Sequence, residues 1–173
     1  MKAVTLNERL LKLLVFSIVF FVCAYYSFAQ PALPQRSLTV TATQGIHFGT
    51  FCLTNGVGGT VTVGYGGERT STGDIVLLNI DPTSHPSVFE IKLCEGRNVI
   101  ITFDATTVLY GIPSGTLTLD IGPTEKGPSG SSFSTNSDCN FITPLRIGGM
   151  LHVPGSVIPG IYTGSFAITF NQQ

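Results

Sequence analysis

The chain closes on Gly160-Ile161-Tyr162-Thr163-Gly164-Ser165-Phe166-Ala167-Ile168-Thr169-Phe170, and only three residues follow this stretch. Its apolar and aromatic side chains share one parity, at Tyr162, Phe166, Ile168 and Phe170, while hydroxyl and small side chains fill the other. Successive side chains of a strand point to opposite faces, so the stretch predicts one strand with an oily face. Such a strand either completes its own sheet or lies at an edge where another chain can pair with it.

The same period-two alternation marks several earlier segments. The clearest are Leu38–Ala42, Thr60–Tyr65, Phe89–Leu93, Val99–Asp104 and Thr116–Ile121. A further set shares the parity of Gly149, namely Leu145, Ile147, Leu151 and Val153. Turn-forming glycines separate the segments, and no stretch after residue 29 has a helical pattern. We therefore expect an all-β fold, an antiparallel sandwich or barrel of about eight to nine strands.

Composition narrows the class of protein. Charged residues make up 11% of the 173 residues, glycines number 20, and tryptophan is absent. Few charges with many Gly, Thr and Val favour an extracellular β-protein over a helical cytosolic enzyme. A net charge of −1 gives no electrostatic basis for binding nucleic acid or an anionic membrane surface.

The first residues have the pattern of a secretory signal peptide. Lys2, Arg9 and Lys12 accompany the apolar run Leu13–Ala24, and Ser27-Phe28-Ala29 supplies the small residues that a signal peptidase reads. The alternative is a membrane anchor, but the run is shorter than the ~20 apolar residues that a spanning helix needs. We expect cleavage after Ala29 and export to the periplasm, the cell surface or the extracellular space.

The sequence then divides into two further parts. Residues 30–37 contain Pro31 and Pro34 and predict an extended leader, because proline disrupts both helices and sheet pairing. Residues 38–173 form the predicted β-sandwich domain. We expect no membrane span in the mature chain and no partnership with nucleic acid.

Three cysteines remain after cleavage: Cys52, Cys94 and Cys139. In an oxidising compartment one pair forms a disulfide and one thiol is left over, and the spacing does not choose among the three pairings. A metal site is the alternative. We expect none, since the cysteines lack metal-ligand spacing and no histidine lies near them in sequence.

Signals of catalysis are weak throughout. His47, His85 and His152 are isolated in sequence, and no serine lies in a Gly-x-Ser-x-Gly elbow. The glycine clusters at 56–59 and 64–67 lead into no helix and lack the lysine of a phosphate-binding loop. The prediction is a non-enzymatic protein without a cofactor.

Four pieces of the chain together carry a family resemblance. They are His47-Phe48-Gly49-Thr50-Phe51, Arg69-Thr70-Ser71-Thr72-Gly73, Ile147-Gly148-Gly149-Met150-Leu151-His152-Val153 and Pro159-Gly160-Ile161-Tyr162-Thr163-Gly164-Ser165-Phe166. In this order they resemble a domain-of-unknown-function family of secreted bacterial proteins similar to fimbrial and pilin-like adhesin domains. The resemblance covers Leu38 to Phe170 and implies an immunoglobulin-like sandwich with a structural or adhesive role.

The resemblance also bears on the cysteines and on the end of the chain. Related pilin-like domains carry an early cysteine and another that ends a strand, which implies a Cys52–Cys94 disulfide, with Cys139 as the alternative partner. Chaperone-assembled pilins end with an aromatic residue next to last. Here that position is Gln172, and Phe170 is the last aromatic residue.

The leading hypothesis is a secreted fimbrial-like subunit that assembles through strand pairing with like subunits or other surface proteins. The candidate assembly residues lie in the first and the closing strand: Leu38, Val40, Ala42, Tyr162, Phe166, Ile168 and Phe170. Ordinary core packing is the competing explanation for each of them. One alternative function is a monomeric secreted module that binds a glycan or a protein through its loops, including residues 122–140, and another is an unrecognised secreted hydrolase.

Overall fold

A computed structural model describes residue 11 and residues 13–18, 37–93 and 96–173. The chain divides into two compact units, Met1–Gln35 and Arg36–Gln173. In the first unit the described residues are helical. Most of the predicted signal peptide and nearly all of the Pro-containing leader lie outside the described residues, so both stay predictions.

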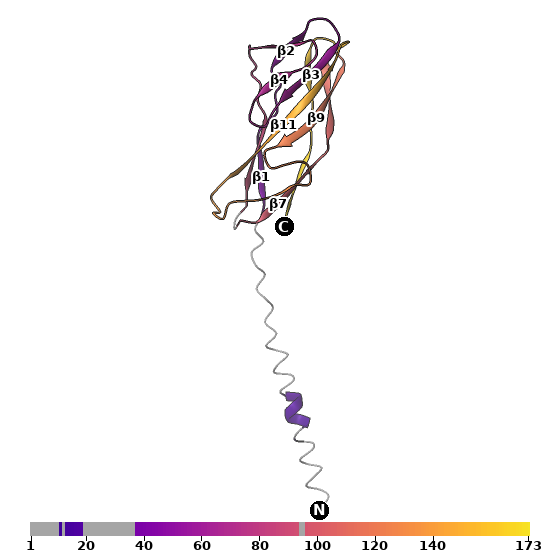
Figure 1. Cartoon of the computed structure of the whole chain (residues 1–173). Coiled ribbons are helices and arrows are strands. Elements are labelled where there is room, and N and C mark those ends of the chain that lie inside the picture. Colours follow the sequence, from indigo (N-terminus) through magenta and orange to yellow (C-terminus); the bar gives the residue numbers. More distant parts are fainter. Residues whose placement is uncertain (1–10, 12, 19–36, 94–95) are drawn as a thin grey trace, which may run out of the picture. The chain divides into compact units, whose positions relative to one another are not determined.

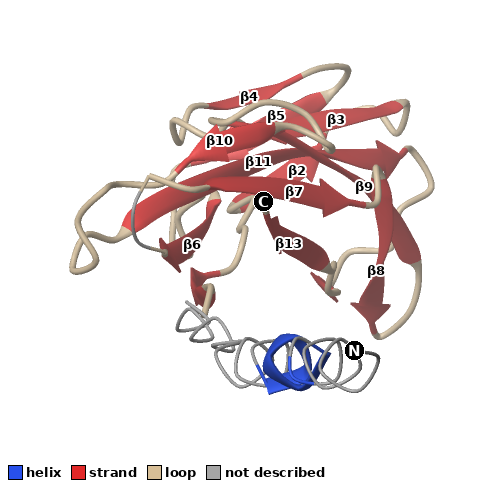
Figure 2. Cartoon of the chain, turned by 90° about the horizontal axis from the view of Figure 1, so that it is seen from below, coloured by secondary structure: helices blue, strands red, loops and turns tan. Residues whose placement is uncertain are grey.

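The described part of the second unit is built from β-strands that pair antiparallel (Figures 1 and 2). The strands are β1 (Thr39–Gln44), β2 (Thr50–Leu53), β3 (Gly58–Val63), β4 (Arg69–Ser71), β5 (Ile75–Leu78), β6 (Ser87–Lys92), β7 (Asn98–Phe103), β8 (Thr106–Ile112), β9 (Thr116–Thr124), β10 (Ser132–Ser134), β11 (Thr143–Pro154), β12 (Ile161–Thr163) and β13 (Ile168–Gln172). The prediction of a mostly antiparallel all-β fold is confirmed, but the described residues form 13 strands where about eight to nine were expected.

The strands form a large sheet and two small ones. The large sheet has eight strands in the order β1-β6-β11-β9-β8-β12, with β3 paired to β11 and β4 paired to β3. A three-stranded sheet has the order β10-β7-β13, and β2 pairs with β5. The predicted loop over residues 122–140 is therefore not wholly irregular, because it contains β10.

Strand β11 organises the large sheet. On one edge its first half pairs with β6, from Thr143 to Ile147, and its second half pairs with β3, from Gly149 to Pro154. Its other edge pairs with β9. The predicted parity is confirmed here, since four side chains of β11 are at most 3% exposed: Leu145, Ile147, Leu151 and Val153.

Two hydrophobic cores lie along β11. Leu151 and Val153 belong to the first core, whose other buried members are Phe48, Val61, Val63, Ile75, Leu109, Leu117 and Leu119. Leu145 and Ile147 belong to the second core with Ile91 and Ile101. Partly buried Ile121 packs against both cores. The two halves of β11 thus serve different cores, with Gly148 and Gly149 between them.

The closing stretch corrects the prediction of one continuous strand. Residues 161–163 form β12 and pair with β8 in the large sheet, whereas residues 168–172 form β13 and pair with β7 in the three-stranded sheet. Between them, Gly164 passes so close to β8 that a Cβ there would lie 2.6 Å from Leu109 Cδ2. The close approach and the break in pairing let the chain change sheets, which alternation alone does not reveal.

Gly148 provides a test of the packing around β11. A Cβ on Gly148 would collide with the carbonyl oxygen of Val63 and lie 3.0 Å from Gly64 Cα, so the backbones of β11 and β3 must separate in a Gly148→Ala variant. We expect this variant to lose about 1–3 kcal/mol of unfolding free energy in urea denaturation, the usual cost of overpacking. The control is Gly45→Ala, where a Cβ meets nothing within 4 Å. Equal stabilities of the two variants would contradict the close packing.

Candidate functional site

The predicted assembly residues of the first strand lie at an edge of the large sheet. Among the described residues β1 pairs only with β6, from Thr39 opposite Lys92 onward, which leaves its second edge without a strand. Leu38 and Val40 are half-buried against the second core. Ala42 is exposed and belongs to neither core.

The predicted residues of the closing stretch separate into two groups. Tyr162 packs against the first core, and its hydroxyl donates to the carbonyl of Ile158 at 2.7 Å. Ile168 and Phe170 pack against the second core, where the Phe170 ring lies 5.9 Å from that of Phe89. Phe166, in the crossover between the sheets, is half-buried.

Two open strand edges therefore border the same core. In the described part of the chain β13 pairs only with β7, just as β1 pairs only with β6. In Figure 1 the yellow C-terminal strand and β1 lie in the same half of the domain as β7. An unpaired edge presents N–H and C=O groups that an added strand can satisfy. β10 also borders this core and pairs only with β7, but it is three residues long. The longer edges of β1 and β13 are thus the structural candidates for strand addition.

The expected disulfide between Cys52 and Cys94 is not found. Cys52 is an exposed, free thiol on β2, and its neighbour across the strand pair is Val76. Cys94 lies outside the described residues. The flanking segments favour the alternative with Cys139, because the Gly96 N–H donates to the Asn136 carbonyl at 3.1 Å and the Thr135 N–H donates to the Arg97 carbonyl at 2.9 Å. Because Cys52 is free, we predict a Cys94–Cys139 pair, which is one of the three pairings that the sequence leaves open.

Two histidines that lie far apart in sequence meet in space. His47 and His85 exchange backbone hydrogen bonds of 2.9 Å in both directions, and their ring centroids lie 5.7 Å apart. The His47 Nδ1 also accepts a hydrogen bond from the Gly49 N–H at 2.8 Å. Burial first, and then the positive charges of His85 and Arg69, lower the pKa of His47 below 6.5. The contact links the segment after β1 to the loop before β6.

Arg69 connects the large sheet to the two-stranded sheet. Its Nη2 donates to the Thr50 carbonyl on β2 at 2.7 Å, and its Nη1 donates to the Leu78 carbonyl on β5 at 3.2 Å. The buried Nε has no partner among the described residues. Burial lowers the pKa of Arg69. These contacts give Arg69 a structural role in holding β2 and β5 against β4.

Asp74 and Asp120 are two of the acidic side chains that have defined partners. The Asp74 carboxylate accepts three backbone hydrogen bonds of 2.8–2.9 Å, from Asn55, Val57 and Gly58, and these lower its pKa. It thereby fixes the turn before β3. On the large sheet, Asp120 Oδ2 lies 2.7 Å from His152 Nε2, and both side chains are partly exposed. Among the described residues, no serine, threonine or cysteine side chain is hydrogen-bonded to His152, so the pair is not part of a catalytic triad there.

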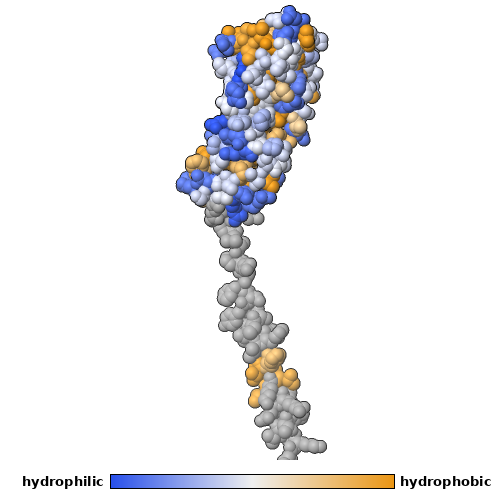
Figure 3. Space-filling model, viewed as in Figure 1, coloured by the Kyte–Doolittle hydropathy of each residue, from blue (hydrophilic) through white to orange (hydrophobic). Residues whose placement is uncertain are grey.

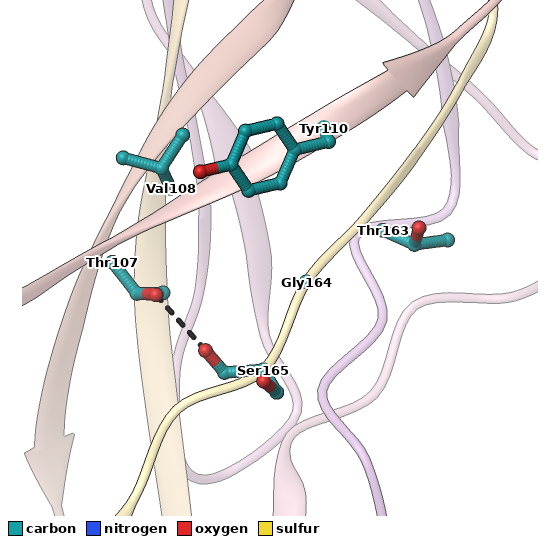
Figure 4. A pocket seen from close by; sticks show the side chains of 6 residues that line it. All are labelled: Thr107, Val108, Tyr110, Thr163, Gly164 and Ser165. Carbon is teal, nitrogen blue, oxygen red and sulfur yellow. Dashed lines mark hydrogen bonds between the residues drawn. The ribbon is translucent and has the colours of Figure 1, made fainter.

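An open hollow lies where β12 leaves the sheet (Figure 4). It has a volume of about 640 Å³, and its lining consists of Thr107, Val108, Tyr110, Thr163, Gly164 and Ser165. The Thr107 hydroxyl donates to the Ser165 carbonyl at 2.9 Å, which ties the departing chain to β8. No pattern in the sequence predicts this hollow, because the hollow depends on the break in strand pairing after Thr163.

Exposed hydrophobic side chains are unevenly distributed. In Figure 3 they gather at the end of the domain where β2 and β3 lie in Figure 1. Ile112 and Ile161 pair across β8 and β12 and are 71% and 73% exposed.

No group of three or more His, Cys, Asp or Glu side chains in the described part of the chain is placed to hold a metal ion. No described helix has the length and apolar character to cross a membrane.

These features define the class as an antiparallel β-domain with open strand edges. A protein family described as a domain of unknown function, DUF4402, matches residues 38–171. The chain belongs to this family, which confirms the resemblance to a domain of unknown function. Neither the curated proteins nor the solved structures contain a match to the chain.

The cysteine pairing is open to a direct test. We expect non-reducing peptide mapping of the oxidised mature protein to recover Cys94 linked to Cys139, with Cys52 alkylated by iodoacetamide before denaturation. Cys52→Ser should leave the linked peptide unchanged, whereas Cys139→Ser should remove it. Recovery of a Cys52-containing disulfide would contradict this assignment.

The His47 environment predicts a fall in stability at mildly acidic pH. The pKa of His47 is lower in the folded than in the unfolded chain, so the unfolded state binds more protons once the pH falls below about 6.5. The melting temperature should therefore drop from about pH 8 to about pH 5.5, where carboxylates stay mostly ionised. His47→Gln should reduce this drop, and the control His152→Gln should retain it. An unchanged pH dependence in His47→Gln would exclude His47 as its source.

Proposed function

We propose that the chain is a non-enzymatic, exported subunit with a fimbrial-like structural and adhesive role, and that it assembles by strand pairing. The observation that best supports this proposal is that β1 and β13 border the same core. In the described domain each of these strands has one edge without a partner. Main-chain hydrogen bonds along such an edge provide affinity, and alternate side chains select the added strand.

An immunoglobulin-like sandwich is the fold that we propose for this domain. In support, residues of the large sheet and of the β10-β7-β13 sheet share the second core. The chain also changes sheets between β12 and β13, as strands do at the corners of packed sheets. Such an arrangement has a natural place for an added strand at each edge.

The donated segment in this proposal is residues 30–37 of a second copy. Pro31 and Pro34 lack an N–H, so the segment would pair through its carbonyl groups and the N–H groups of its other residues. The structure pairs β1 with β6 of the same chain, so Leu38 and Val40 contribute to their own domain. The segment before Leu38 is then the part of the chain available for donation. Ile168 and Phe170 would contact it beside the β13 edge, whereas Tyr162 serves the first core.

Export is part of the proposal. Its support is the basic and apolar pattern before Ala29 and the paucity of charged residues, 11% of the chain. The protein would then reside in the periplasm, at the cell surface or outside the cell. A disulfide between two of the remaining cysteines would be stable in such an oxidising environment.

A binding module that acts as a monomer is the second candidate function. The observation in its favour is the hollow beside β12, which lies between β8 and the chain that leaves β12 and needs no assembly.

The assembly proposal predicts the behaviour of a protein that begins at Gln30. Replacing residues 30–37 by a Gly/Ser linker of equal length should abolish polymers in light scattering and negative-stain microscopy. The thermal unfolding of the monomer should stay unchanged, because the linker replaces no residue of the described strands.

A peptide with the sequence of residues 30–37 provides the second half of this test. It should bind the linker variant, while a peptide of scrambled sequence should not. Polymers that persist in the linker variant, or a strictly monomeric parent protein that also ignores the peptide, would overturn the assembly proposal.

A further inference from the structure

The hollow beside β12 has two walls of different origin (Figure 4). Val108 and Tyr110 come from β8, while Thr163, Gly164 and Ser165 come from the chain that leaves β12. The two walls separate because β12 pairs with β8 only from Ile161 to Thr163. The hollow is therefore fixed by the main chain and by the bond from Thr107 to Ser165.

Its lining combines free hydroxyls with an exposed aromatic ring and carries no charge. Tyr110 is 65% exposed and packs into neither core. Within the described residues the hydroxyls of Tyr110, Thr163 and Ser165 make no side-chain hydrogen bond. They are therefore available as donors and acceptors. The six lining residues include no Asp, Glu, His, Lys or Arg, so the site favours an uncharged ligand.

An apolar surface continues the wall formed by Tyr110. Tyr110 and Ile112 lie on the same face of β8, two residues apart, and Ile161 on β12 pairs with Ile112. The exposed fractions of Ile112 and Ile161 are 71% and 73%. A ligand that lies along this surface would meet an aromatic ring and aliphatic groups on one side and hydroxyls on the other.

We propose that the hollow binds a neutral saccharide, with Tyr110 as the stacking platform and the hydroxyls of Thr163 and Ser165 as hydrogen-bond partners. A sugar ring has an apolar C–H face that packs against an aromatic ring and a rim of hydroxyls that pair with other hydroxyls. The volume of about 640 Å³ lies in the range of small-molecule sites. This site supplies a ligand class for the adhesive role proposed above and rests on that role, but strand pairing does not require it.

The shape and chemistry of the hollow favour a saccharide over an apolar protein surface. An apolar partner would bury the three hydroxyls without hydrogen bonds, which costs free energy. A saccharide satisfies those hydroxyls and still covers the Tyr110 ring. The short open wall holds few sugar units, so the affinity of one site is low and repeated copies on an assembly would raise the overall affinity.

Saturation-transfer NMR on the protein that begins at Gln30 tests the proposal. The probes are cellohexaose, xylohexaose, mannohexaose and chitohexaose, with polygalacturonate as the anionic control. We expect at least one neutral probe to bind and polygalacturonate to bind more weakly. Tyr110→Ala should weaken the interaction about tenfold or more, because it removes the stacking surface.

Tyr65→Ala is the matched control, since Tyr65 is an exposed tyrosine outside the hollow, at 43% exposure. It should bind as the parent protein does, and Tyr110→Ala should form the same polymers as the parent. A variant with Thr163→Val and Ser165→Ala should also lose binding while keeping the Tyr110 ring. Binding by no neutral probe, equal binding by Tyr110→Ala, or a change of oligomeric state in place of a loss of binding would overturn the saccharide site. Polymers that persist in the linker variant would count only against strand pairing, so the two proposals fail separately.

Discussion

The structure depends on the pairing of β11 with two different strands along one edge. β6 occupies the first half of that edge and β3 the second, while β9 runs along the opposite edge. Each half of β11 therefore places its inward side chains in a different core. Gly148 permits the arrangement because any side chain there would push β11 away from β3. The remaining strands of the large sheet extend it on either side of β11. Residues of the two small sheets pack against the two cores.

Local patterns in the sequence predicted several of the longer strands, but they missed β8 and did not show where the strands pair. The alternation around Leu145 and Leu151 correctly assigned the inward face of β11, because burial of one sheet face imposes a period of two. The closing stretch shows the limit of that argument. Its alternation continues from Tyr162 to Phe170 although the strand breaks, because both parts keep their oily side chains toward a core. The alternation of apolar and polar residues predicts which face of a sheet a side chain lies on, but it does not predict to which sheet the strand belongs.

The candidate sites were less accessible to sequence reasoning for the same reason. His47 and His85 were isolated in sequence, and only the bridge between two loops brings their rings together. The hollow forms because the chain after Thr163 stops pairing with β8. Gly164 is the only lining residue whose type reflects this break. The open edges of β1 and β13 could be suspected from their positions near the ends of the predicted domain. Their convergence on one core required the sheet order.

The paired positions of β1 and β13 have a mechanical consequence. Thr39 at the start of β1 lies opposite Lys92, and Gln172 at the end of β13 lies opposite Val99, so both ends of the domain emerge beside the turn between β6 and β7. Tension applied between these two ends would load the hydrogen bonds of each strand one after another, as in unzipping. A strand held lengthwise along an edge would instead share the load over all its hydrogen bonds at once. If subunits assemble by strand addition as proposed, the added strand would resist a lengthwise pull better than β1 or β13 resists a pull on its free end.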